Sequence, residues 1–177
     1  MALGELSIEG LRALVRDVPD FPKPGIMFKD ITPLIGSADG LASCVARLAA
    51  LTPAGVEAVV AIESRGFLFG APLALRLGLP VIPVRKPGKL PYHKRRIEYA
   101  LEYGTDALEM HADALAHHRK VIIVDDVLAT GGTAAATARL CRDAGGEVAA
   151  FAFVIELSFL TGRKLLGSAP IHTLLNY

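Results

Sequence analysis

Two adjacent carboxylates and a glycine-rich turn are the residues of this chain best suited to chemistry. Asp125 and Asp126 follow the apolar run Val121–Val124, and Thr130–Thr133 then opens a stretch of helical character. The backbone N–H groups of such a turn, with threonine hydroxyls and a helix N-terminus, form a nest for a phosphate. Carboxylates beside that nest would repel the phosphate unless they bind another group. They are suited to accept hydrogen bonds from a sugar diol and to anchor Mg²⁺ directly or through its waters.

This turn differs from the common nucleotide-binding motifs. No lysine follows Gly131 and Gly132, so the turn is not a Walker A loop, and the GxGxxG dinucleotide pattern is also missing. The combination therefore predicts a site that takes a phosphate and a sugar diol together. The alternative is an acidic strand end that leads into a capped helix without binding anything.

Short apolar runs must form the elements that position this turn. Unbroken runs of this kind are typical of strands buried on both faces of a parallel sheet. The predicted strands are Val56–Ile62, Leu79–Val84, Val121–Val124 and Val148–Ile155. The predicted helices are Ile8–Val18, Ala38–Leu51, Gly66–Leu77 and Thr133–Ala144. Their alternation predicts an α/β fold, a doubly wound and mostly parallel sheet flanked by helices, which binds ligands at the carboxyl ends of its strands.

Two segments do not fit this alternation. Phe21–Gly25 holds two prolines and a glycine and is predicted to be a stiff loop. Lys86–Tyr103 begins with proline and glycine and then turns basic, and apolar and polar residues alternate over 108–111. We expect a long hairpin or flap that projects from the sheet, with the basic residues His93–Arg96 at its tip. A helix over Asp106–His117 is the alternative.

The composition fits one globular domain. The chain has 177 residues, 52% hydrophobic and 21% charged, with a net charge of +1. That balance gives no positive field to attract nucleic acid or an acidic membrane. No run approaches the roughly 18 apolar residues of a membrane helix, and the N-terminus does not resemble a secretory signal. Cys44 and Cys141 have no metal-ligand spacing, so we expect reduced thiols in a cytoplasmic protein without nucleic-acid or membrane partners.

The segment VIIVDDVLATGGT (Val121–Thr133) resembles the signature by which type I phosphoribosyltransferases bind 5-phosphoribosyl-1-pyrophosphate (PRPP). Four further segments resemble one branch of that family, the adenine phosphoribosyltransferases. They are DFPKPGIMFKDITPL (Asp20–Leu34), IESRGFLFGAPLA (Ile62–Ala74), VRKPGKLP (Val84–Pro91) and LEYGTDALEMH (Leu101–His111). The similarity extends from about Ile8 to Tyr177, so it covers nearly the whole chain.

The resemblance implies a fold and a reaction. It implies a type I phosphoribosyltransferase-like domain over residues 1–177, with a base-binding hood at about 1–35 and a flexible hairpin flap at 86–105. The implied reaction transfers the 5-phosphoribosyl group of PRPP to N9 of adenine and yields AMP and pyrophosphate. The resemblance also implies a requirement for Mg²⁺, a homodimer and a cis peptide at Glu63–Ser64.

The same resemblance assigns expected roles to individual residues. The 5′-phosphate would be bound by Ala129, Thr130, Gly131, Gly132 and Thr133, and the ribose by Asp125 and Asp126, which would also hold Mg²⁺, directly or through water. Pyrophosphate would be bound by Glu63, Ser64, Arg65, Arg85, Lys86 and Lys89. Adenine would be bound by Met27, Phe28, Lys29, Val127 and Leu128. Glu102, Arg65 and Lys86 would be the catalytic residues, and Tyr103 would belong to the flap.

Elementary chemistry supports these roles but leaves alternatives open. Pyrophosphate needs converging cations, and a planar base needs an aromatic face such as Phe28. Arg65 could instead form a surface salt bridge, Phe28 could be core packing, and Glu102 could be a solvated hairpin residue. The rival functions are transfer to hypoxanthine, guanine or orotate, and a regulator that senses PRPP or a nucleotide without catalysis.

Overall fold

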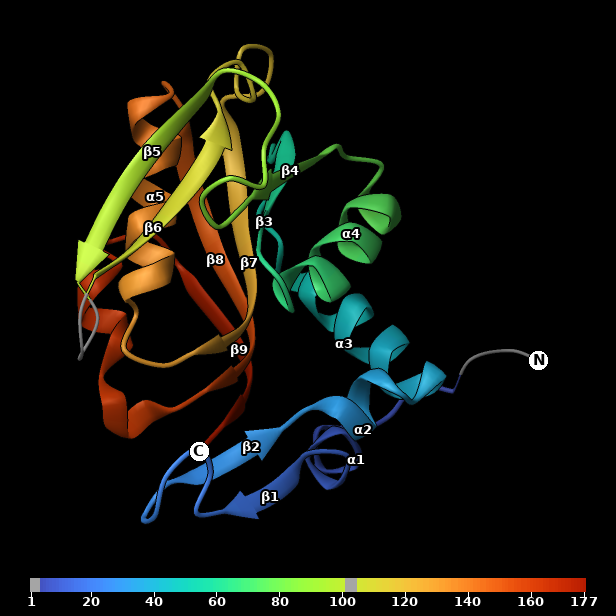
Figure 1. Cartoon of the computed structure of the whole chain (residues 1–177). Coiled ribbons are helices and arrows are strands. Elements are labelled where there is room, and N and C mark those ends of the chain that lie inside the picture. Colours follow the sequence, from blue (N-terminus) through green and yellow to red (C-terminus); the bar gives the residue numbers. More distant parts are fainter. Residues whose placement is uncertain (1–3, 101–104) are drawn as a thin grey trace.

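A five-stranded parallel sheet forms the centre of the protein, in the order β4-β3-β7-β8-β9 (Figure 1). The structure is a computed structural model that describes residues 4–100 and 105–177. The strands are β3 (Ala58–Ile62), β4 (Val81–Val84), β7 (Lys120–Leu128), β8 (Glu147–Glu156) and β9 (Ile171–Asn176). The residues of β3 are all buried, as expected for a strand covered on both faces.

Helices cover both faces of this sheet, which confirms the doubly wound α/β prediction. Helices α3 (Ala38–Leu51) and α4 (Gly66–Leu77) pack on one face, and α5 (Gly132–Asp143) packs on the other (Figure 1). Two apolar clusters, one on each side of the sheet, make up the core. Helix α4 ends at Gly78, whose φ of +68° suits a residue without a side chain.

The N-terminal segment departs from the prediction. The expected helix over Ile8–Val18 is wrong beyond Ala13, because α1 covers Ile8–Ala13 and β1 covers Arg16–Pro19. Strand β1 pairs with β2 (Met27–Asp30) in an antiparallel hairpin, and Val18 lies opposite Phe28. Pairing between distant residues thus outweighs the local helical spacing. A short helix, α2 (Thr32–Ile35), then leads into α3.

The flap is present as a hairpin of two antiparallel strands, β5 (Lys94–Ala100) and β6 (Thr105–His111). The alternative helix over Asp106–His117 is wrong, since β6 occupies its first half. Lys94 pairs with His111 at one end of the ribbon and Ala100 pairs with Thr105 at the other. The basic residues therefore stand where β5 begins and not at a tip next to 101–104, which corrects that expectation. Glu102 and Tyr103 lie outside the described residues.

Element boundaries elsewhere follow the prediction with one instructive exception. Strand β7 continues through the aspartate pair to Leu128, four residues beyond the predicted end at Val124. It continues because β8 offers partners along its whole length, with Asp125 opposite Phe153 and Leu128 opposite Glu156. Strand β9 and the 3-10 turns η1 (Ser158–Leu160) and η2 (Gly162–Leu165) were not predicted.

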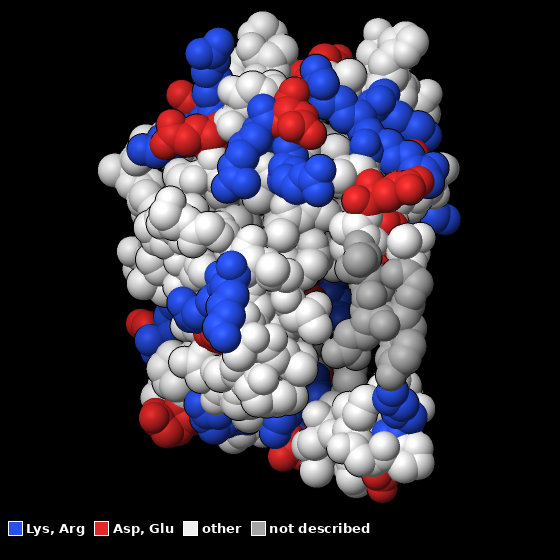
Figure 2. All heavy atoms as spheres, turned by 90° about the vertical axis from the view of Figure 1, so that its left-hand side faces the viewer, with Lys and Arg blue, Asp and Glu red and all other residues white. Residues whose placement is uncertain are grey.

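The surface that carries the β5–β6 hairpin mixes charges of both signs (Figure 2). On this hairpin Arg96 pairs with Glu98 at 3.0 Å, and Lys94 pairs with the buried Glu109 at 3.0 Å. Within residues 4–100 and 105–177, no helix is both long and apolar enough to span a membrane.

Candidate active site

A cavity of about 1450 Å³ lies at the carboxyl ends of β3 and β7 and collects most of the predicted site residues. From the sheet and its turns come Glu63, Ser64, Arg65, Lys86 and the whole segment Asp125–Thr133. From the N-terminal hairpin come Met27, Phe28 and Lys29. Among the described residues, Arg85 and Lys89 are the predicted site residues that do not line it. The fold therefore brings segments that are far apart in the sequence to one site, and their individual roles remain predictions.

The glycine-rich turn is built to present backbone N–H groups. Gly131 has a φ of +84° and forms the N-cap of α5, so a residue with a side chain would be strained there. The first turn of a helix leaves N–H groups without intrahelical partners, and these attract anions. Thr133 adds a hydroxyl, whose Oγ1 lies 3.2 Å from the hydroxyl of Tyr99 on β5. The turn is thus a suitable phosphate site.

The two aspartates have different surroundings. Arg65 Nε donates to Asp126 Oδ2 at 2.5 Å, and the Asp126 side chain is only 6% exposed. Asp125 packs beneath the start of α4, where a Cβ on Gly66 would lie 2.8 Å from Asp125 Oδ1. Burial raises the pKa of Asp125 well above its ordinary value, and the neighbouring charge of Asp126 raises it further. The ionised form of Asp125 is therefore disfavoured unless a further cation lies nearby.

This pair fits a magnesium ion that is shared with a substrate. Across the described residues, no group of three or more His, Cys, Asp or Glu side chains could hold a metal by itself. Mg²⁺ often binds through one or two carboxylates, with phosphate oxygens of the substrate and water completing its shell. A cation bound there would favour the ionised form of the buried Asp125.

The segment after β4 is held by a partly buried glutamate, Glu63. Arg85 Nε donates to Glu63 Oε2 at 3.0 Å, and the Lys86 backbone N–H donates to the same oxygen at 2.8 Å. The hydrogen bond from Arg85 lowers the pKa of Glu63, so this carboxylate is ionised at neutral pH. The peptide between Glu63 and Ser64 is cis, as the resemblance implied. Arg85 therefore orients Glu63, while Lys86 faces the cavity.

Lys86 has partners that the sequence reading missed. Its Nζ pairs with Asp106 on β6 and lies 3.5 Å from the hydroxyl of Tyr99 on β5. The hydrogen bond from Lys86 lowers the pKa of Asp106. The hairpin thus contacts both the lysine and, through Tyr99, the glycine-rich turn at Thr133.

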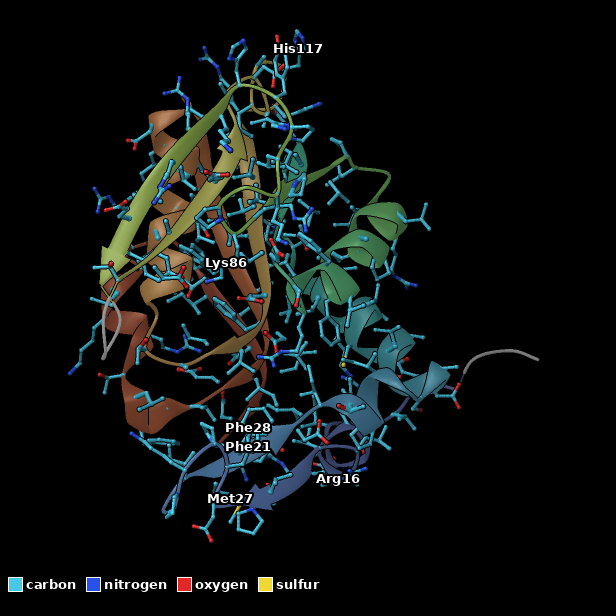
Figure 3. The ribbon with its side chains drawn as sticks, viewed as in Figure 1. Arg16, Phe21, Met27, Phe28, Lys86 and His117 are labelled. Atoms are coloured by element: carbon cyan, nitrogen blue, oxygen red, sulfur yellow. The ribbon has the colours of Figure 1, made fainter. Side chains whose placement is uncertain are left out.

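The N-terminal hairpin closes one end of the cavity with aromatic and cationic groups. Phe28 meets Phe21 edge to face, with ring centroids 5.0 Å apart, and both lie with Met27 on this hairpin, below Lys86 in the view of Figure 3. Lys29 Nζ lies 2.6 Å from Asp17 Oδ1 and 4.2 Å from the centre of the Tyr177 ring. The lining residues missed by sequence reasoning include four near the C-terminus, Leu157, Phe159, Leu160 and Tyr177. The β-branched residues Ile171 and Thr173, followed by two leucines, could have indicated the strand that carries the chain to Tyr177.

Comparison with known proteins agrees with this geometry. The family model described as "Phosphoribosyl transferase domain" matches residues 37–164. An adenine phosphoribosyltransferase of Rippkaea orientalis is 56% identical, over 94% of this chain and 99% of the relative.

Solved structures extend the agreement to the fold. The adenine phosphoribosyltransferase of Thermoanaerobacter pseudethanolicus has a TM-score of 0.92 at 50% identity, covering 97% of this chain and 100% of that one. The enzyme of Saccharomyces cerevisiae, solved with adenine and an imino-altritol bisphosphate, has a TM-score of 0.88 at 39% identity, covering 94% and 97%. This chain therefore belongs to the type I phosphoribosyltransferases and, within them, to the adenine phosphoribosyltransferase family.

Proposed function

We propose that the cavity at the carboxyl ends of β3 and β7 transfers the 5-phosphoribosyl group of PRPP to N9 of adenine, forming AMP and pyrophosphate for purine salvage. The observation that carries this proposal is the meeting of three kinds of group in one cavity: the aspartate pair, the turn at 129–133 and the aromatic hairpin around Phe28. The yeast relative, crystallised with adenine and a phosphorylated imino sugar, supports the assignment.

Each part of the substrate matches one part of the cavity. The backbone N–H groups of 129–133 take the 5′-phosphate, and Asp125 and Asp126 accept hydrogen bonds from the ribose hydroxyls. The pyrophosphate is bound by Arg65, Lys86 and the turn at Glu63–Ser64. Arg85 and Lys89, which do not line the cavity, add positive charge nearby. Adenine lies against Phe28, between Met27, Lys29, Val127 and Leu128. In this proposal residues 1–35 act as the hood of a single domain.

The order of bond changes follows from these charges. The bond from C1′ to the pyrophosphate oxygen lengthens first, its electron pair leaves with pyrophosphate, and the sugar ring becomes oxocarbenium-like. Arg65 and Lys86 stabilise the negative charge that grows on the leaving group, an effect of about 3 kcal/mol for each well-placed donor. The aspartate pair stabilises the cationic ring. Mg²⁺, when bound with PRPP, supplies further neutralisation of the pyrophosphate charge.

The base then completes the reaction. N9 of adenine attacks C1′ from the face opposite pyrophosphate and inverts that carbon, and the base loses one proton. Glu102 is the proposed acceptor of that proton, at N7 directly or in relay with N9. Closure of the β5–β6 hairpin over the reactants would exclude the water that otherwise hydrolyses the activated sugar.

Two properties of the protein in the cell complete the proposal. Helix α4 exposes Leu68 and Leu75, seven positions apart on the same face, and such unpartnered apolar residues support a homodimer.

Cys44 and Cys141 are buried and unpaired, which supports a cytoplasmic location because disulfides are rare in that compartment.

Product analysis tests the proposed function. The protein is incubated with adenine, PRPP and MgCl₂, and AMP and pyrophosphate are measured by chromatography. We expect equal amounts of both products, and almost none from the double variant Asp125→Asn/Asp126→Asn. Hypoxanthine, guanine and orotate, each offered in competition with adenine, should yield little nucleotide. PRPP binding without AMP formation would instead identify a sensor, and preference for another base would overturn the adenine assignment.

A further inference from the structure

The segment 157–166, here called the bridging segment, touches both ends of the cavity. Its first part supplies Leu157, Phe159 and Leu160 to the lining. The Ser158 N–H donates to the carbonyl of Tyr177 at 2.9 Å, and the Tyr177 ring lies 4.2 Å from Lys29 Nζ on the N-terminal hairpin. Its second part begins at Gly162, where η2 starts, and packs against the glycine-rich turn 129–133, here called the phosphate turn for its proposed role. One short stretch of chain thus contacts the region proposed for the base and the turn proposed for the phosphate.

The contact at Gly162 is backbone against backbone. A Cβ on Gly162 would overlap the carbonyl oxygen of Ala129 and lie 2.9 Å from the amide nitrogen of Gly131. A Cβ on Gly131 would in turn lie 3.1 Å from the Cα of Gly162. Since Gly162 has no positive φ, its need for glycine comes from this close approach and not from backbone strain. The phosphate turn therefore rests on Gly162.

The bridging segment is tied down on both sides of that contact. At its start, the Leu157 N–H donates to the Leu128 carbonyl at 2.9 Å, next to the phosphate turn. After Gly162, Arg163 donates to both oxygens of the Glu156 carboxylate, at 2.6 Å each. The Glu156 side chain is 8% exposed and also accepts from Thr173 Oγ1 at 3.2 Å, and Leu166 closes the segment in the core.

The paired geometry of Arg163 sets where Gly162 can lie. A bidentate arginine–carboxylate pair fixes orientation as well as distance, so Arg163 cannot rotate without breaking one of its bonds. Its Nη1 also donates to the Ile171 carbonyl at 3.2 Å. Arg163 itself does not line the cavity, within the part of the chain that the structure describes.

We infer that Gly162 and Arg163 are positioning residues for the phosphate turn: Gly162 forms the floor on which the N–H groups of 129–133 are aligned, and the Arg163–Glu156 pair holds that floor in place. The inference rests on the proposed function, because it takes the turn to bind the 5′-phosphate. It adds two residues outside the substrate-contacting set to the determinants of PRPP affinity.

The decisive experiment compares Gly162→Ala with Ser168→Ala, a control at an exposed loop position just after the bridging segment that does not line the cavity. Ribose 5-phosphate is the probe in titration calorimetry, because it carries the monoester without a base. We expect Gly162→Ala to weaken its binding at least about tenfold, since one methyl group in a filled contact displaces the turn. The control should match the wild type in binding and in Tm.

Steady-state kinetics separate positioning from general damage. For Gly162→Ala the KM for PRPP should rise at least about tenfold, while the KM for adenine at saturating PRPP changes less than about threefold. Unchanged ribose 5-phosphate affinity in the folded variant, or equal losses for both substrates, would overturn the inference. If the wild type binds no ribose 5-phosphate or makes no AMP, the proposed function itself fails.

A second pair of variants decides the matter if Gly162→Ala does not fold. Arg163→Lys keeps the charge but loses the bidentate geometry, and Arg163→Gln loses both. The KM for PRPP should increase in the order wild type, Arg163→Lys, Arg163→Gln, with adenine little affected. An identical KM for PRPP in all three proteins would show that the pair does not position the turn.

Discussion

Arg65 Nε lies 2.5 Å from Asp126 Oδ2, so a cation at the start of α4 neutralises one of the two carboxylates at the end of β7. The other carboxylate, Asp125, is buried beside Asp126 and has a raised pKa. Arg65 thus balances the charge of Asp126, whereas the ionised form of Asp125 would be favoured by a further cation. The Arg65 side chain remains 53% exposed, and it can therefore also face an anionic substrate.

Replacing Arg65 should damage both the substrate site and the aspartate pair. In Arg65→Met, kcat/KM for PRPP should fall by about 10²–10³, because a charge-stabilising donor is lost and Asp126 stays buried without its partner. The control is Arg76→Met on the same helix, an exposed position that should change kcat/KM less than about twofold. Steady-state kinetics and thermal unfolding of both variants check this, and equal behaviour of the two would contradict it.

The two lysines after β4 should differ in importance. Lys86 lines the cavity, whereas Lys89 is exposed and does not. Lys86→Met should lower kcat/KM for PRPP about a hundredfold, and Lys89→Met less than about tenfold, because exposed charges are screened by salt. Kinetics at low and high ionic strength test the difference. A larger loss for Lys89→Met would mean that the pyrophosphate lies outside this cavity.

Glu102 is expected to handle the proton of the base. Glu102→Gln should lower kcat by more than about tenfold and leave the KM for PRPP nearly unchanged, since the amide cannot accept that proton. Glu98→Gln, which alters an exposed glutamate on β5, is the matched control. Turnover of Glu102→Gln near the wild-type value, measured across pH 6 to 9, would remove Glu102 from the mechanism.

The Glu156–Arg163 pair predicts a pH-dependent part of the stability. The hydrogen bond from Arg163 lowers the pKa of Glu156 below its ordinary value of 4.5. A carboxylate whose pKa is lower in the folded state stabilises that state at every pH above its unfolded-state pKa. This contribution is lost as the pH falls through the folded-state pKa.

Denaturant unfolding of Glu156→Gln reveals that contribution. At pH 7 the free energy of unfolding of the variant should be about 1–3 kcal/mol lower than that of the wild type, because Arg163 loses a charged partner. The difference should shrink as the pH falls below the ordinary glutamate value of 4.5 and the wild-type carboxylate becomes protonated. Glu147→Gln, at an exposed site, should show no such trend. A difference that stays constant with pH would mean that the pair does not supply the stability.

The two cysteines should not react with thiol reagents in the folded protein. Burial raises the pKa of Cys44 and of Cys141 to about 12 in each case, and only the thiolate reacts with disulfide reagents. Titration with 5,5′-dithiobis(2-nitrobenzoic acid) near pH 8 should therefore detect almost no thiol until denaturant is added, and then two for each chain. Rapid labelling of the folded protein would contradict the burial of these residues.

The contiguous parts of the site could be read from the sequence. The strand, the aspartate pair, the glycine turn and α5 follow one another over residues 120–143, and helical or alternating spacing reports such neighbours directly. The buried parallel strands were also predicted from local sequence, because an unbroken apolar run is typical of a strand that is buried on both faces. The N-terminal hairpin was not predicted, since Arg16–Pro19 extends only by pairing with Met27–Asp30.

The contacts between distant segments were decided by the tertiary structure alone. Arg65 and Asp126 are 61 residues apart, and their pairing depends on β3 and β7 being neighbours in the sheet. The bond of Lys86 to Asp106 and the packing of Gly162 on the glycine-rich turn depend likewise on strand order and on crossovers. The amino-acid sequence by itself determined which chemical groups the protein holds and the local elements that carry them. Their distances and charge states required the folded sheet, because burial and Coulomb interactions act through space and not along the chain.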